Sequence, residues 1–102
     1  MNQKKAQKHR NKQEARAAVL GWTVEGWEDY LWWQENNPKI VREINKLVQE
    51  CLRDPFKGTG KPEPLKGDLT GFWSRRITDR DRLVYYPGEG RVVVMMCRLH
   101  YS

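Results

Sequence analysis

The sequence predicts an α+β fold in which two N-terminal helices pack on one face of a small, mainly antiparallel sheet, in the order β-α-α-β-β-β. Three observations lead to this prediction. The chain has 102 residues, which is enough for one small domain. Two segments with helical periodicity precede three strand-like runs. Short turns join those runs into an antiparallel meander, and helices on one side of it leave the other face free to form a site.

The N-terminal half supplies the first strand and the first helix. Residues 19–22 are apolar and partly β-branched, as in a strand. The large side chains that follow recur at the spacing of one helical face and are Trp27, Tyr30, Leu31 and Gln34.

The second helix is the most strongly patterned element. Asn37 is a candidate cap with Pro38 at the first helical position, and the helix should end at Arg53 because residues before a proline, here Asp54, avoid helical geometry. Its apolar stripe consists of Ile40, Val41, Ile44, Leu47, Val48, Cys51 and Leu52.

The C-terminal half begins with a long loop. Residues 55–71 contain three prolines and four glycines, so we expect neither a helix nor a central strand there. Strand-like runs then cover residues 72–78, 82–86 and 91–101. Alternation in the last run predicts one face formed by Val93, Met95, Cys97 and Leu99, and another formed by Val92, Val94, Met96, Arg98 and His100.

Charge and cysteine content narrow the class of protein. The net charge is +6, but residues 1–18 hold six basic groups against Glu14, so we expect a basic arm there and a domain over 19–102. The arm is a solvated tail or a nucleic-acid contact.

Cys51 and Cys97 lack metal-ligand spacing and are predicted to be buried free thiols. No long apolar stretch or secretory signal is present, which favours a cytoplasmic protein without a membrane partner.

Two residues are candidates for acid–base chemistry. Glu63 lies between Pro62 and Pro64, which makes it a rigid carboxylate suited to act as a general base, unless the segment is only a stiff surface turn. His100 is the one histidine within 19–102, and an imidazole can donate or accept a proton near neutral pH. Taken alone, it fits an ordinary surface histidine near the C-terminus better than a catalytic one.

Arginines complete this set. Arg75 and Arg76 should point to opposite faces of their strand, and Arg82 begins the neighbouring strand. A solvated basic sheet edge is the alternative interpretation. A carboxylate, a histidine and several arginines without a metal-ligand cluster suit metal-independent RNA cleavage, in which a ribose 2′-OH is deprotonated and guanidinium groups stabilise the phosphorane.

Specific motifs add a family resemblance from about residue 19 onward. WEDYLWWQ at 27–34, GKPEPL at 60–65, GFWSRRI at 71–77 and CRLHY at 97–101 closely resemble the YoeB (Txe) toxins of the RelE superfamily. The resemblance implies a bacterial toxin-antitoxin endoribonuclease that cuts mRNA in the A site of the 70S ribosome and is silenced by a YefM-type antitoxin.

The resemblance also implies roles for individual residues. It implies Glu63 as general base, His100 as general acid and Arg82 as the arginine that stabilises the transition state. Positions that bind phosphate or orient the nucleotide are Lys66, Arg76 and Tyr101. It further implies a homodimer, no cofactor or metal, and contact with operator DNA only through the antitoxin complex.

Two departures and three alternatives stand beside this interpretation. Leu99 replaces a residue that is commonly aromatic in the family, and Ser102 extends the chain beyond the usual terminal tyrosine. A non-catalytic toxin of the RelE/ParE fold, directed for example at gyrase, and an antitoxin-dependent transcriptional corepressor are alternatives. A small RNA-binding accessory protein that uses the arm is a third. A pure binder would have no need of Glu63, Arg82 and His100 together.

Overall fold

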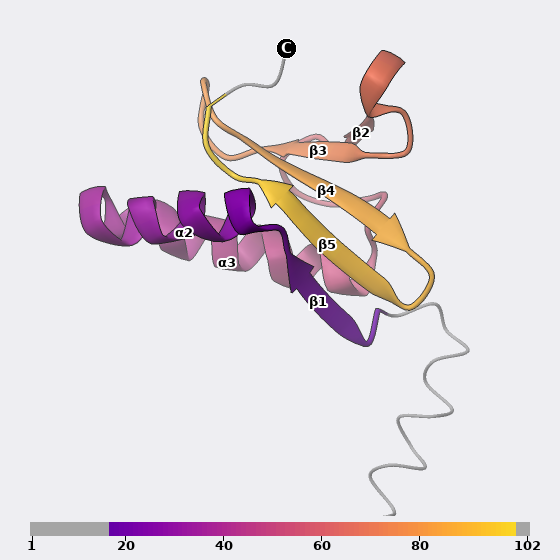
Figure 1. Cartoon of the computed structure of the whole chain (residues 1–102), viewed down its shortest axis with the longest axis horizontal. Coiled ribbons are helices and arrows are strands. Elements are labelled where there is room, and N and C mark those ends of the chain that lie inside the picture. Colours follow the sequence, from indigo (N-terminus) through magenta and orange to yellow (C-terminus); the bar gives the residue numbers. More distant parts are fainter. Residues whose placement is uncertain (1–16, 100–102) are drawn as a thin grey trace, which may run out of the picture.

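The computed structural model describes residues 17–99, which fold as two helices on one face of a five-stranded sheet (Figure 1). The strand order is β1-β5-β4-β3-β2, and every neighbouring pair is antiparallel except β1 with β5. The predicted α+β class with a mainly antiparallel sheet is therefore confirmed. The strands are β1 (Val19–Trp22), β2 (Glu63–Pro64), β3 (Trp73–Arg76), β4 (Arg82–Gly88) and β5 (Arg91–Met96).

Helix α2 (Val24–Asn36) is fastened to β5 at its first turn. The Thr23 hydroxyl accepts a hydrogen bond from the backbone N–H of Gly26 (3.0 Å) and donates one to the Met95 carbonyl (2.8 Å). A Cβ at position 26 would lie 2.7 Å from the Val94 carbonyl oxygen, so glycine is what allows the helix to approach the strand this closely.

Helix α3 (Pro38–Arg53) has the predicted bounds, with Pro38 at its first position. Asn37 is the single residue between the two helices. Its side chain makes no capping hydrogen bond, and its backbone N–H donates to the Trp33 carbonyl (2.8 Å) to close α2. The buried residues of α3 belong to the predicted apolar stripe and are Ile44, Leu47, Val48 and Cys51.

The core lies between the helices and the inner face of the sheet. Cys51 and Cys97 are both buried there as free thiols, as predicted. Burial raises the pKa of Cys51 to about 11 and that of Cys97 to about 12, so both thiols are protonated at neutral pH. The other buried members of this cluster are Trp33, Ile44, Leu47, Val48, Leu83, Tyr85, Val92 and Val94.

Strand β5 carries a bulge that changes the predicted alternation. Val84 of β4 pairs with Met96, whereas the next residue, Tyr85, pairs with Val94. One residue of β5, Met95, is therefore extra between the two pairs, and an extra residue shifts which side chains point toward the core.

Two sequence predictions about this strand are wrong, and the bulge explains the first. Val92 and Val94 belong to the core cluster, and so does Cys97, which strict alternation had assigned to the opposite face. The strand also ends at Met96 instead of continuing to residue 101. Beyond Met96 the backbone N–H of Cys97 donates to Asp29 Oδ2 of α2 (3.0 Å), so its acceptor is a side chain and not the backbone of a neighbouring strand.

The predicted loop over residues 55–71 contains the two-residue edge strand β2 and a single 3₁₀ turn at Gly67–Leu69. The prediction of no central strand holds, whereas the prediction of no helix is wrong for that short turn. Strand β3 is shorter than expected, and β4 extends two residues further.

The start of the described chain is attached to the domain. Ala17 N–H donates to the Leu52 carbonyl (3.1 Å), and Ala18 N–H donates to the Gly90 carbonyl (2.9 Å). Residues 1–16 of the predicted basic arm lie outside the described residues, so the arm stays a prediction. Within 17–99, neither helix is long and apolar enough to cross a membrane.

Candidate functional site

The sheet face that points away from α2 and α3, which we call the outer face, carries the strand residues of the predicted site. Leu83 and Tyr85 belong to the core cluster, and Arg75 reaches Glu50 of α3, so these three side chains point toward the helices. Because side chains alternate along a strand, Arg76 points to the outer face. The predicted opposition of Arg75 and Arg76 is confirmed.

The register of the strands arranges the outer face in rows. Glu63 lies opposite Ser74, which lies opposite Val84, and in the adjacent row Arg76 lies opposite Arg82. Adjacent rows are two residues apart along a strand, about 7 Å. Glu63 and Arg76 are exposed, while Arg82 is half-buried. A carboxylate and two arginines predicted from sequence therefore share one face.

The backbone before Glu63 is held in a strained conformation. The Gly60 carbonyl accepts a hydrogen bond from Arg76 N–H (2.7 Å), and a Cβ at position 60 would lie 3.0 Å from the Arg76 carbonyl oxygen. Lys61 follows with φ 49°, which residues other than glycine rarely adopt. Strain of this kind clusters at functional sites.

Arg75 is completely buried and attaches the loop over residues 54–59 to the sheet. The Tyr85 hydroxyl donates to the Pro55 carbonyl (2.6 Å) from the same face. The Arg75 guanidinium donates to the carbonyls of Asp54 (2.7 Å), Lys57 (2.9 Å) and Thr59 (3.2 Å), to Glu50 Oε1 (3.1 Å) and to the Tyr85 hydroxyl (3.1 Å). This network fixes the segment that leads to Glu63.

Arg82 begins β4 directly after a tight turn. Its Nη1 donates to the carbonyls of Thr78 (2.9 Å), Asp79 (3.4 Å) and Asp81 (3.1 Å). The guanidinium is thus oriented by the turn.

Asp81 connects this turn to the C-terminal segment. Its Oδ1 accepts from Leu99 N–H (2.7 Å), and its Oδ2 accepts from the Thr78 hydroxyl (2.7 Å). The Leu99 carbonyl accepts from Arg82 N–H (3.0 Å). Leu99 has φ 65°, so a second strained residue is held from both sides, immediately before residue 100.

Three predicted site residues do not fall in these rows. His100 and Tyr101 lie outside the described residues, and their roles stay predictions. Lys66 is exposed and follows β2, where its carbonyl accepts from Leu69 N–H (3.2 Å) in the 3₁₀ turn.

Arg98 stacks on Trp32 of α2, with Cζ 3.8 Å from the ring centroid. The face that it is predicted to share with His100 stays a prediction, because His100 lies outside the described residues. The chain turns toward α2 after the bulge, where Asp29 also holds the Cys97 amide. Burial raises the pKa of Asp29, and the hydrogen bond from Cys97 opposes that shift.

The sequence patterns assigned no role to Asp81, and none to Arg75 as the buried member of the Arg75–Arg76 pair. The sequence signals only the turn itself, because Thr and Asp are residue types that favour turns, and in the structure the Thr78 hydroxyl accepts from Asp81 N–H (3.0 Å). For Arg75, the sequence does contain a signal: an arginine at an inward position of a strand must be paired, because an unpaired buried charge is costly.

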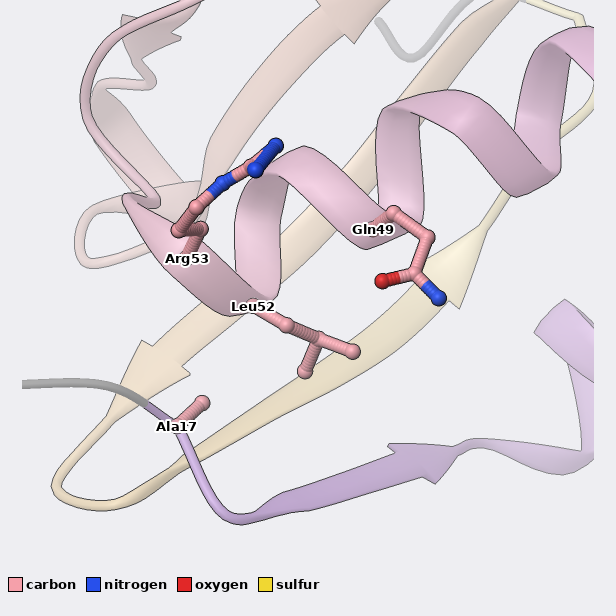
Figure 2. Close-up of a pocket in the computed structure, with 4 residues that line it drawn as sticks. All are labelled: Ala17, Gln49, Leu52 and Arg53. Atoms are coloured by element: carbon pink, nitrogen blue, oxygen red, sulfur yellow. The ribbon is translucent and has the colours of Figure 1, made fainter. Parts of the chain in front are cut away.

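A shallow pocket of about 240 Å³ lies on the helix side, lined by Ala17, Gln49, Leu52 and Arg53 (Figure 2). Three of its residues come from the last turns of α3, and Ala17 precedes β1. It is separate from the outer face. Within residues 17–99, no group of three His, Cys, Asp or Glu side chains could hold a metal ion.

Comparison with known proteins gives a consistent family. The sequence model of a family described as the YoeB-like toxin of bacterial type II toxin-antitoxin systems matches residues 22–101. Toxin YoeB of Streptomyces coelicolor is 55% identical over 80% of this chain and 98% of its own length. Toxin YoeB of Escherichia coli K12 is 52% identical over the same shares.

Solved structures agree with this assignment. A YoeB/ParE toxin from Agrobacterium tumefaciens has a TM-score of 0.78 and 50% identity, covering 81% of this chain and 99% of its own. A YoeB dimer from Staphylococcus aureus has a TM-score of 0.77 and 39% identity over 85% of this chain and 100% of its own. A YoeB-YefM complex from the same organism has a TM-score of 0.75 and 40% identity over the same shares. The chain therefore belongs to the YoeB-like toxins of bacterial type II toxin-antitoxin systems.

Proposed function

We propose that this toxin is a ribosome-dependent mRNA endoribonuclease that cleaves without a metal ion. The observation that carries the proposal is the register of the outer face, in which Glu63 lies one row from Arg76 and Arg82. A carboxylate beside two guanidinium groups suits an attack by a ribose 2′-OH on its own phosphodiester.

In the proposed reaction, Glu63 takes the proton from the 2′-OH, and that oxygen attacks the adjacent phosphorus. Arg82, assisted by Arg76, stabilises the added negative charge on the phosphorane. His100 protonates the departing 5′ oxygen, leaving a 2′,3′-cyclic phosphate and a 5′-hydroxyl. General acid and base groups contribute about 10²–10⁴-fold each. Lys66 and Tyr101 would bind phosphate or orient the nucleotide.

The proposed partners follow from the family. The Staphylococcus aureus relatives were solved as a dimer and as a complex with YefM. We therefore expect a homodimer, silencing by a YefM-type antitoxin, and contact with operator DNA only within that antitoxin complex. A toxin with mRNA on the 70S ribosome as its target acts in the cytoplasm.

The decisive experiment is primer extension on a defined ribosome complex with mRNA in the A site. We expect Glu63→Gln and His100→Gln each to abolish cutting while leaving thermal unfolding and antitoxin binding unchanged. Glu89→Gln is a matched control, because Glu89 is an exposed carboxylate in the turn between β4 and β5. Full cutting by both site variants would refute the assignment and favour a non-catalytic toxin.

A further inference from the structure

The outer face continues beyond the carboxylate row, and its next row is aromatic. Phe72 and Tyr86 form a T-shaped pair with ring centroids 5.5 Å apart. Tyr86 is two residues beyond Val84 on β4, so this pair lies about 7 Å from the row of Glu63. Along β4 the outward residues are Arg82, the buried Val84 and then Tyr86, and Glu63 belongs to the row of Val84 on the edge strand β2.

The Tyr86 ring is held firmly but remains open to solvent. It is 39% exposed. A Cβ built on Gly88 would lie 3.1 Å from Tyr86 Cε2, and one built on Gly71 would lie 3.7 Å from Cε1. Two glycines thus leave room for the ring, and Phe72 supports it.

A cation follows the aromatic row. Arg91 of β5 pairs with Gly88, two residues beyond Tyr86, and its side chain is exposed. The same Cβ built on Gly88 would lie 3.1 Å from Arg91 Nε, so the arginine and the tyrosine ring both lie beside Gly88. Successive rows of the outer face therefore hold Arg76 and Arg82, then Glu63 at the β2 edge beside the buried Ser74 and Val84, then the aromatic pair, and then Arg91, at steps of about 7 Å.

We propose that Phe72, Tyr86 and Arg91 form a subsite for the nucleotide next to the cleaved linkage, with its base stacked on the ring pair and its phosphate on Arg91. This inference rests on the proposed function, because it extends the same site. A single-stranded RNA offers flat bases and regularly spaced anions, which match an aromatic pair followed by an arginine. Stacking tolerates any base, so the subsite would add affinity more than sequence preference.

The test uses the full chain carrying Glu63→Gln, so that RNA is bound without being cut. The probe is a short single-stranded RNA with 2-aminopurine beside the cleavable linkage. We expect its fluorescence to fall on binding. Adding Tyr86→Ala should abolish the fall and weaken binding about 5- to 100-fold, whereas Tyr86→Phe should retain both. Phe56→Ala is the control, since Phe56 is 49% exposed and packs on Trp73, whose side chain contacts the core.

The phosphate contact has its own signature. Arg91→Gln should reduce the slope of log affinity against log salt by about 0.7, the value for one contact to a single strand. Arg42→Gln, on the exposed side of α3, should leave that slope unchanged.

The outcomes separate this inference from the proposed function. If Tyr86→Ala cuts and binds RNA like the parent chain while Glu63→Gln is inactive, the subsite is refuted and the endoribonuclease assignment stands. A loss of antitoxin affinity without a loss of RNA affinity would also refute it, and would assign the ring pair to the antitoxin. If the parent chain neither binds RNA nor cuts ribosome-bound mRNA, both proposals fail.

Discussion

Asp81 shows how much one side chain can organise. Its carboxylate joins the turn before β4 to the backbone of Leu99, while the neighbouring Arg82 holds the Leu99 carbonyl. The residue proposed as general acid, His100, comes next in the chain. The orientation of Arg82 and the path of the C-terminal segment are therefore coupled through a few hydrogen bonds.

We predict that Asp81→Ala lowers the single-turnover rate of cutting about 10- to 100-fold, because a displacement near 1 Å costs about that much. The concentration giving half-maximal rate should change little, and Asp81→Asn should recover most of the rate by keeping an acceptor for Leu99 N–H. Hydrogen exchange at Leu99 N–H should become faster in Asp81→Ala only. Asp79→Ala, in the same turn, is the control. An unaltered rate in Asp81→Ala would contradict the prediction.

At the scale of elements, the sequence predicted the bounds of an element best where its apolar residues follow one clear periodicity. Helix α3 has the predicted bounds because its apolar stripe and Pro38 agree. Strand β5 was mispredicted because Val92 through Met96 are all apolar, so nothing in the sequence marks the extra residue Met95. For the site, the sequence suggested candidate residue types, and the structure places Glu63 and Arg82 on one face, while their catalytic roles stay predictions. The role of Asp81 depends on a contact to Leu99, distant in sequence, that no local pattern encodes.

The loop before Glu63 should be sensitive to a single methyl group. Gly60→Ala combines φ 87° with a Cβ 3.0 Å from the Arg76 carbonyl oxygen, so we expect about 2–4 kcal/mol of destabilisation and loss of cutting. Gly67→Ala, at φ 65° with no atom within 4 Å, should cost only about 1 kcal/mol. Chemical denaturation measures both. Equal costs would show that the crowding at Gly60 is unimportant.

The junction between α3 and the loop should give a pH-dependent stability. Hydrogen bonds from Thr59 N–H and hydroxyl (2.7 Å each), aided by Arg75, lower the pKa of Glu50. Because the pKa of Glu50 is lower in the folded state than its usual value of 4.5, the ionised carboxylate stabilises the folded state above pH 4.5. This stabilisation is lost as the pH falls through the pKa of Glu50 in the folded state.

Glu50→Gln should therefore lower the free energy of unfolding by about 1–3 kcal/mol at pH 7, because Arg75 loses its charged partner. The two proteins should converge as the pH falls below 4.5 and through the lowered pKa of Glu50 in the folded state, since protonated glutamate and glutamine are close in shape and charge. Denaturation curves at pH 7, 5, 4 and 3 test this, and a difference that does not shrink as the pH falls below 4.5 would contradict it.

At the scale of the whole molecule, the largest exposed apolar residues gather around β1 and α2. Trp22, Trp27 and Tyr30 pack against one another with ring centroids 4.8–5.8 Å apart, yet Trp27 is 45% exposed and Leu31 is 40% exposed. Exposed aromatic clusters mark protein contacts. This surface is therefore the candidate contact for the homodimer proposed above.

We expect Trp27→Ala to shift the chain toward monomer, measured by sedimentation at several concentrations. Phe56→Ala, which removes another exposed ring, should leave the oligomeric state unchanged. A dimer as tight as the parent in Trp27→Ala would place the interface elsewhere.

The order of strands in the sheet also bears on synthesis of the protein. Strand β5 lies between β1 and β4, although it is the last strand to be made. A nascent chain that has not yet emerged past residue 96 leaves β1 without its partner and β4 with an open edge. Folding must therefore wait for contacts across about seventy residues, which are slow to form. A ribosome making this toxin thus releases nearly the whole chain before the outer face exists.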